Sequence, residues 1–152
     1  MKRFLPIFFI GLLFWSCGEE ERLTFNEQLE ADEQVILDYL TANNIDAEQG
    51  DLGLYYVIEE PGVGDQFPNI NSTVIVNYRG YFPDGTVFDE GQGFQITLRQ
   101  TIGGWQVGIP LFKKGGKGQL FIPSGLGYGQ FGNSAVPGNQ VLIFDVELIN
   151  FL

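Results

Sequence analysis

Residues 73–89, TVIVNYRGYFPDGTVFD, decide the fold of this chain because they combine a strand pattern, a tight turn and a returning strand. In residues 73–82, apolar and aromatic side chains recur at even positions, which is typical of a strand with one buried face: Val74, Val76, Tyr78 and Phe82. Pro83 and Gly85 then favour a tight turn, after which the chain returns through Val87-Phe88-Asp89. The stretch therefore predicts an antiparallel hairpin in which Tyr78 shares the face of the core valines.

Further strands and one short helix are expected on either side of this hairpin. The other predicted strands are Leu54–Glu59, Phe94–Leu98, Lys117–Pro123 and Gln140–Phe151. Residues 102–112 carry Trp105, Ile109 and Phe112 at helix-like spacing, and glycines follow them, so a short helix is predicted there. Five glycines in residues 124–139 predict a mobile or sharply folded segment, which we call the flap. The fold class is α+β.

Residues 1–17 are typical of an export signal. Two basic residues precede an apolar run, Phe4–Trp15, which is too short for a comfortable membrane span. A small residue before the lone Cys17 resembles the lipobox of bacterial lipoproteins, in which the cysteine is acylated and becomes the mature N-terminus. The alternative is an ordinary secretory signal in which Cys17 is incidental. Lipidation is the favoured interpretation, and it predicts a cell-envelope protein anchored to a bacterial membrane, either periplasmic or surface-exposed.

Residues 24–44 follow a helical pattern. Apolar side chains recur there at three- and four-residue spacing: Leu29, Val35, Ile36, Tyr39 and Leu40. Thr24 or Asn26 is a suitable N-cap, and Asn43-Asn44 end the pattern. This amphipathic helix packs on the domain, pairs with a second copy or spaces the domain from the membrane. Packing is favoured, because a single apolar stripe on a short helix gives only a small interface.

Charge and composition exclude several classes of function. The formal net charge is −11, and it becomes −13 if a leader carrying Lys2 and Arg3 is removed. Such a surface repels phosphate backbones, so no nucleic-acid partner is expected. The chain has no histidine and one cysteine, which excludes Ser-His and Cys-His nucleophile pairs, histidine-ligated metals and an internal disulfide. We expect no cofactor and no metal, since no spacing typical of a metal-binding loop is visible.

Several short motifs follow one another along residues 54–152. They are Val76-Asn77-Tyr78-Arg79-Gly80, Asp84-Gly85-Thr86-Val87-Phe88-Asp89, Ile102-Gly103-Gly104-Trp105, Phe121-Ile122-Pro123, Gly127-Tyr128-Gly129 and Phe144-Asp145-Val146-Glu147-Leu148. In this order they resemble the signatures of FKBP-type peptidyl-prolyl cis-trans isomerases. The resemblance implies a twisted antiparallel sheet wrapped around one short helix. The chain then divides into a lipoprotein signal at 1–17, an acidic tether with the amphipathic helix at 18–53, and the isomerase domain at 54–152.

The resemblance also implies an apolar pocket with Trp105 as its floor. Its walls would be aromatic: Tyr78, Phe88, Phe94, Tyr128 and Phe144. Asp89 would be the main buried polar group, although the stretch after it lacks the arginine that often pairs with this aspartate in the family. Ile102 would add an aliphatic wall and a backbone amide for a substrate carbonyl, and Val136 lies near a contact position. Phe94, Ile102 and Val136 would bind substrate, whereas Asp89 and the other aromatics named above would be catalytic.

The implied activity is rotation about Xaa-Pro bonds in exported or envelope proteins, which assists their folding. Rotation breaks no covalent bond, so the scarcity of nucleophiles and bases fits this activity. The partners would be proline-containing polypeptides, and a macrolide is a candidate ligand. Two alternatives stay open: a non-catalytic, membrane-tethered chaperone or peptide-binding module that uses the same pocket, and simple core packing for any single aromatic.

Overall fold

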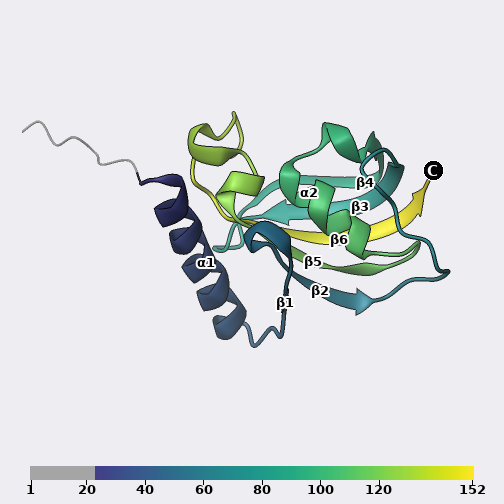
Figure 1. The fold of residues 1–152 in the computed structure, drawn as a ribbon, viewed down its shortest axis with the longest axis horizontal. Coiled ribbons are helices and arrows are strands. Elements are labelled where there is room, and N and C mark those ends of the chain that lie inside the picture. Colours follow the sequence, from purple (N-terminus) through teal and green to yellow (C-terminus); the bar gives the residue numbers. More distant parts are fainter. Residues whose placement is uncertain (1–22) are drawn as a thin grey trace, which may run out of the picture.

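The computed structural model describes residues 23–152, so the predicted signal segment and Cys17 lie outside the described residues. A six-stranded sheet dominates this part of the chain, in the strand order β1-β2-β5-β6-β3-β4 with every neighbouring pair antiparallel (Figure 1). The strands are β1 (Glu48–Gln49), β2 (Tyr55–Glu60), β3 (Thr73–Tyr81), β4 (Val87–Thr97), β5 (Lys117–Ile122) and β6 (Leu142–Phe151). The predicted α+β class, with a short helix against an antiparallel sheet and another helix before it, is confirmed.

The inner face of the sheet packs against a short helix, α2 (Gly103–Gly108), which continues into a 3₁₀ turn, η3 (Ile109–Leu111). Figure 1 shows α2 lying across the middle of the sheet. The period-two faces predicted for β3 and β6 are the ones buried here: Val74, Val76, Leu142, Phe144, Val146 and Leu148. Trp105, Ile109 and Phe112 meet them from the helical side. Burial of these side chains supplies most of the hydrophobic stabilisation of this layer.

The predicted hairpin forms as β3 and β4, and its turn closes through backbone hydrogen bonds between Phe82 and Thr86. Gly85 has a φ of 87°, a conformation that glycine adopts without steric cost. The expectation of two separate strands after the turn is wrong, because β4 runs unbroken from Val87 to Thr97. Its pairing shifts register opposite Val76 and Tyr78, which absorbs the glycines of the intervening segment as a bulge.

A long helix, α1 (Phe25–Ala42), covers part of the outer face of the sheet (Figure 1). Thr24 caps it through a capping box, in which Glu27 N donates to Thr24 Oγ1 and Thr24 N donates to Glu27 Oε2. The buried side of the helix meets outer-face residues of the sheet: Ile36 and Leu40 with Tyr55, Tyr81, Phe121, Val141 and Ile143. The favoured prediction, packing against the domain, is therefore what the structure has. Val35 was wrongly placed on the buried stripe, since it is 42% exposed.

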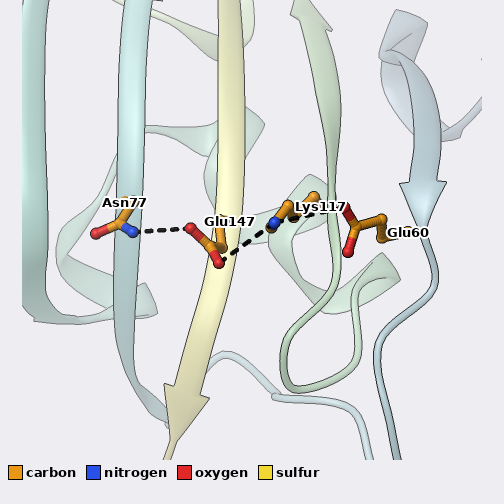
Figure 2. A network of polar contacts seen from close by, with 4 residues as sticks. All are labelled: Glu60, Asn77, Lys117 and Glu147. Carbon is orange, nitrogen blue, oxygen red and sulfur yellow. Dashed lines mark hydrogen bonds and ion pairs between the residues drawn. The ribbon is translucent and has the colours of Figure 1, made fainter.

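Beyond α1 the outer face of the sheet is polar. Glu147 on β6 accepts a hydrogen bond from Asn77 on β3 at 2.8 Å, and it lies 3.8 Å from Lys117 on β5, whose ammonium also reaches Glu60 at 3.4 Å (Figure 2). On the same strand Asp145 accepts hydrogen bonds from Tyr81 and Gln119. The acidic residues of the Phe144–Leu148 motif thus point away from the inner face. On the exposed outer face, ion pairs such as those of Lys117 contribute at most about 1 kcal/mol each to stability.

The segments between the main elements are more ordered than the sequence pattern indicates. The predicted linker before β2 contains β1, which pairs with β2, and a short turn, η1 (Asp51–Gly53). The flap is sharply folded into η4 (Ser124–Leu126) and η5 (Gly129–Phe131), and a backbone hydrogen bond from Asn139 N to Gly129 O closes its end onto η5. None of the helices in residues 23–152 combines the length and the hydropathy that crossing a membrane requires.

Candidate functional site

Trp105 lies at the centre of an aromatic cluster on the inner face of the sheet. Its ring centroid is 5.1 Å from that of Tyr78 on β3 and 5.5 Å from that of Phe144 on β6, with nearly perpendicular ring planes in both pairs. Tyr78 and Phe144 are themselves 6.3 Å apart. Edge-to-face geometry at such distances stabilises aromatic pairs beyond simple burial. The three side chains that the sequence placed at the floor and walls of one pocket are therefore brought together.

The remaining predicted aromatic walls extend this cluster toward solvent. Phe88 on β4 lies 5.5 Å from Phe144, and Phe94 lies 5.7 Å from Tyr78, measured between ring centroids. Phe94 is 40% exposed, so its face is open to a ligand. Phe82 was predicted only as a strand residue. Its ring centroid lies 5.0 Å from that of Phe88, so the two rings pack against each other.

Two glycines make room for these rings, and the sequence analysis did not identify them. A Cβ atom at Gly80 would lie 2.6 Å from Phe88 and 2.8 Å from Phe144, and one at Gly91 would lie 2.7 Å from the Tyr78 ring. Contacts this short force a shift of the ring, so any side chain at either position would displace a wall of the cluster. A glycine inside the predicted strand at 73–82 was a signal for Gly80, whereas Gly91 lay outside the predicted strands and gave none.

Ile102 and Val136 were predicted to contact substrate, and both side chains pack against the core that contains Trp105. Ile102 precedes α2 as its N-cap, is half-buried against the cluster, and accepts backbone hydrogen bonds from Trp105 and Gln106. Its own N–H donates to no backbone acceptor in residues 23–152. Val136 in the flap is buried in the same core, with 2% of its surface exposed. The Val136 side chain therefore packs within the core behind the predicted pocket and has little surface exposed to a ligand.

Asp89 is hydrogen-bonded but not buried, so the expectation of a buried carboxylate is wrong. It lies on β4, which is the edge strand of the sheet, and this position leaves the carboxylate in solvent. The Tyr78 hydroxyl donates to Asp89 Oδ2 at 2.9 Å, which joins the polar group to the aromatic cluster. The described residues provide no ion-pair partner for Asp89, in agreement with the missing arginine. Its firm contact is the Tyr78 phenol.

Tyr128 approaches the cluster from the flap and is half-buried against the core. Burial and the nearby negative charge of Asp89 raise the pKa of its phenol, whereas a hydrogen bond with Asn133 acts in the opposite direction. Asn133 also accepts hydrogen bonds from the backbone N–H groups of Ala135 and Val136, at 2.8 Å each. Asn133 had no predicted role. Its side chain forms an Asx turn that holds the flap in shape beside Tyr128.

The indole N–H of Trp105 distinguishes this cluster from ordinary core packing. The nitrogen is buried and has no hydrogen-bond acceptor among the residues that the structure describes. Leaving a buried donor without an acceptor costs about 1–3 kcal/mol, which a phenylalanine at this position would avoid. Stability alone thus does not account for tryptophan here.

The Tyr78–Asp89 contact leads to a prediction about titration. Burial, followed by the hydrogen bond to Asp89 and its charge, raises the pKa of Tyr78 to about 12 from the ordinary 10.0. The stabilisation contributed by the protonated phenol is therefore complete below pH 10 and is lost as the pH rises through about 12. Phenolate absorbance of the wild type minus that of Tyr78→Phe should show a midpoint near 12, and Asp89→Asn should lower it without reaching 10.0, because burial persists. An unchanged midpoint in Asp89→Asn would contradict the coupling.

Comparison with known proteins places this geometry in context. The family model of the FKBP-type peptidyl-prolyl cis-trans isomerases matches residues 64–149. A protein of Buchnera aphidicola subsp. Schizaphis graminum, named FKBP-type peptidyl-prolyl cis-trans isomerase FkpA, is 40% identical over 102 residues, which cover 64% of this chain and 40% of the relative. A probable FKBP-type peptidyl-prolyl cis-trans isomerase of Haemophilus influenzae is 44% identical over 114 residues, covering 72% of this chain and 47% of that protein. The chain thus spans less than half the length of these relatives.

Two solved structures share the fold. The crystal structure of FkpA from Escherichia coli superposes with a TM-score of 0.71 at 33% sequence identity, covering 83% of this chain and 63% of the other. A peptidyl-prolyl cis-trans isomerase from Pseudomonas syringae pv. tomato superposes with a TM-score of 0.73 at 27% identity, covering 86% of this chain and 97% of the other. The similarity extends over most of this chain, including residues that precede the family-model match.

Proposed function

The chain belongs to the family of FKBP-type peptidyl-prolyl cis-trans isomerases, and from this premise we propose that it accelerates rotation about Xaa-Pro bonds in polypeptides. The observation that carries the proposal is the aromatic cluster of Trp105, Tyr78 and Phe144, whose ring centroids lie 5.1–6.3 Å apart. This cluster gathers three apolar rings on the inner face of the sheet, with the Asp89 carboxylate hydrogen-bonded at its edge. It offers a binding surface and no nucleophile, which suits a reaction without covalent bond cleavage.

The reaction is limited by amide resonance. Rotation about a peptide bond faces a barrier of about 18–20 kcal/mol, because the planar amide has partial double-bond character. Resonance places charge on the amide oxygen and nitrogen, so the planar form is more polar than the twisted form. An apolar pocket that removes water from the amide therefore disfavours the planar form, and binding that prefers the twisted form lowers the barrier directly.

Each site residue has a role in this scheme. The proline ring lies on Trp105, between Tyr78 and Phe144, with Phe88 and the more exposed Phe94 beside them. The Ile102 N–H holds a substrate carbonyl, and Val136 keeps the flap against the pocket. The Tyr128 hydroxyl is a phenol, protonated at neutral pH, and burial raises its pKa further; it donates to a second substrate carbonyl. Asp89 orients Tyr78 and places negative charge beside the rotating bond.

The first test measures acceleration of cis-to-trans isomerisation in proline tetrapeptides in which the residue before proline varies. Acceleration is the expected result. A well-folded protein that binds such peptides without accelerating isomerisation would instead be a non-catalytic binding module. A macrolide that occupies the same pocket should inhibit the isomerisation in competition with the peptide. If the degree of inhibition did not depend on peptide concentration, the macrolide would bind at another site.

Tyr128→Phe tests the predicted hydrogen bond in the same assay. We expect kcat/KM to fall about 2- to 10-fold, since one neutral hydrogen bond is worth about 0.5–1.5 kcal/mol. The matched control is Tyr56→Phe, which removes a hydroxyl that donates to Glu48 on a remote strand. Equal rates for wild type and Tyr128→Phe would refute the assignment of this hydroxyl, whereas a loss in Tyr56→Phe would show that the assay reports general destabilisation.

We further propose that the protein acts on exported or envelope proteins and is held at a membrane by acyl chains on Cys17. The proposal rests on the basic and apolar leader that ends at this lone cysteine. Multiple acyl chains give stable anchoring, where a single chain gives only reversible binding. Mass spectrometry of the native N-terminus tests the idea. A mature chain that begins at an acylated Cys17 supports it, and an unmodified N-terminus or one downstream of Cys17 excludes it.

A further inference from the structure

A second concave surface lies between the first turns of α1 and the flap. This α1–flap groove has a volume of about 940 Å³, within the range of roughly 300–1,000 Å³ typical of ligand pockets. Figure 1 shows the N-terminal end of α1 beside the flap. The apolar residues that line the groove come from both sides: Leu23, Phe25, Leu29, Leu52, Leu126 and Phe131. The sequence analysis assigned none of them to a site.

The groove exposes aromatic surface to an unusual degree. Phe25 on α1 is 74% exposed and Phe131 in the flap is 79% exposed. Leu52, in the turn beneath them, is 67% exposed. A cluster of large apolar side chains in solvent marks a binding surface more often than a single exposed one does. Packing of α1 on the sheet does not require Phe25 or Phe131, because its buried contacts are made by Ile36 and Leu40 further along the helix.

The chemistry of the groove favours an uncharged, apolar partner. Asp32 is the one charged side chain among the described residues that line it, and it is only 3% exposed. Its carboxylate is fully engaged: Ser124 N donates at 2.7 Å, Ser124 Oγ at 2.6 Å and Gln28 Nε2 at 2.7 Å. Within residues 23–152, no charged side chain without a partner lines the groove, although the chain carries 19 acidic residues. The two hydrogen bonds from Ser124 tie η4 to α1 and keep the two walls together.

The groove adjoins the aromatic cluster at Tyr128. This residue lines the groove and also packs against the core that contains Trp105 and Phe144. Tyr128 is thus a wall shared by the two sites. A polypeptide with its proline on Trp105 passes Tyr128 on its way out of the pocket, and the groove is the apolar surface on the far side.

We propose that the α1–flap groove is an extended subsite that binds apolar side chains flanking the proline of a polypeptide client. This inference rests on the proposed isomerase function, and it adds a preference among clients. It makes α1 part of the substrate-binding surface. Segments with apolar residues near proline are buried in a native client, so such a subsite selects unfolded or partly folded chains.

The test compares a proline tetrapeptide with two longer peptides of equal length, one flanked by leucine and phenylalanine and the other by serine and glycine. The substitution Phe25→Ser removes the exposed ring on α1, which approaches Gly125 of the flap. Val35→Ser is the matched control, because Val35 is an exposed apolar residue of the same helix outside the groove. Phe131→Ser, on the opposite wall, is the second variant in case the first unfolds.

We expect Phe25→Ser and Phe131→Ser to lower kcat/KM for the apolar long peptide about fivefold or more, in line with the loss of part of a buried aromatic side chain. The tetrapeptide and the serine–glycine peptide should keep their rates in both variants, and Val35→Ser should change none of them. Equal losses on all three peptides, or no loss on any, would overturn the proposal. A dimer that dissociates on Phe25→Ser while peptide rates stay constant would assign the groove to a second copy and overturn it as well.

Failure of the proposed function has a different signature. If the wild type does not accelerate isomerisation of the tetrapeptide, the isomerase assignment fails. The groove can then still be tested by measuring peptide binding. Fluorescence anisotropy of the labelled apolar peptide should then still show weaker binding to Phe25→Ser than to Val35→Ser. Equal binding to these two variants would exclude the subsite independently of catalysis.

Discussion

Asp89→Asn should lower kcat/KM for proline tetrapeptides about 10- to 100-fold while leaving the fold intact. Such a loss corresponds to about 1.4–2.7 kcal/mol of transition-state stabilisation, which we assign to the charge of Asp89. Asparagine keeps an acceptor for the Tyr78 hydroxyl, which donates to Asp89 at 2.9 Å. The substitution therefore removes mainly the charge beside the rotating bond. Because Asp89 is exposed, we expect the free energy of unfolding to change by less than about 1 kcal/mol.

Two further variants separate the roles of Asp89. Tyr78→Phe removes the hydrogen bond and keeps the charge, so a loss as large as that of Asp89→Asn would show that orientation of Tyr78 is what matters. Asp84→Asn is the matched control, since Asp84 is an exposed aspartate in the turn of the same hairpin and accepts from Thr86 N at 2.8 Å. Activity of Asp89→Asn equal to that of Asp84→Asn would remove Asp89 from the mechanism.

Phe121→Ala should destabilise the protein by about 3–5 kcal/mol, a large share of the roughly 5–15 kcal/mol typical of a folded domain. Phe121 is fully buried on the outer face of β5, and its ring centroid lies 6.0 Å from that of Tyr39 on α1. Removing the ring leaves a cavity between the helix and the sheet. Denaturant unfolding should show a lower midpoint with an unchanged slope, and hydrogen exchange should show weaker protection of α1.

The exposed Phe131 provides the control for this substitution. The same change, Phe131→Ala, should alter the free energy of unfolding by no more than about 0.5 kcal/mol, because the ring is 79% exposed. A loss below about 1 kcal/mol in Phe121→Ala would mean that α1 contributes little to the domain. That result would favour the alternative in which the helix acts as a spacer between the domain and the membrane.

Local chemistry accounts for the parts of the fold that could be predicted. The alternation through Val74, Val76 and Tyr78 determines which face of β3 is buried, because successive side chains of a strand point to opposite faces. Pro83 and Gly85 determine where the hairpin turns. Thr24 and Glu27 cap α1 within one turn of helix. Each of these signals operates over a few residues, so the order of residues is sufficient to find it.

The tertiary structure alone decided where these elements meet. The period-two faces, the turns and the helices could be found from the order of residues, since those depend on neighbours along the chain, whereas the set of aromatic residues in the pocket was implied by the resemblance to the isomerase family. Exposure of Asp89 depends on β4 lying at the sheet edge, the need for Gly80 depends on rings from two other strands, and the α1–flap groove depends on a buried Asp32–Ser124 contact across 92 positions of sequence. Such pairings are set by the packing of whole elements, and a periodic pattern within one element carries no information about its distant partner.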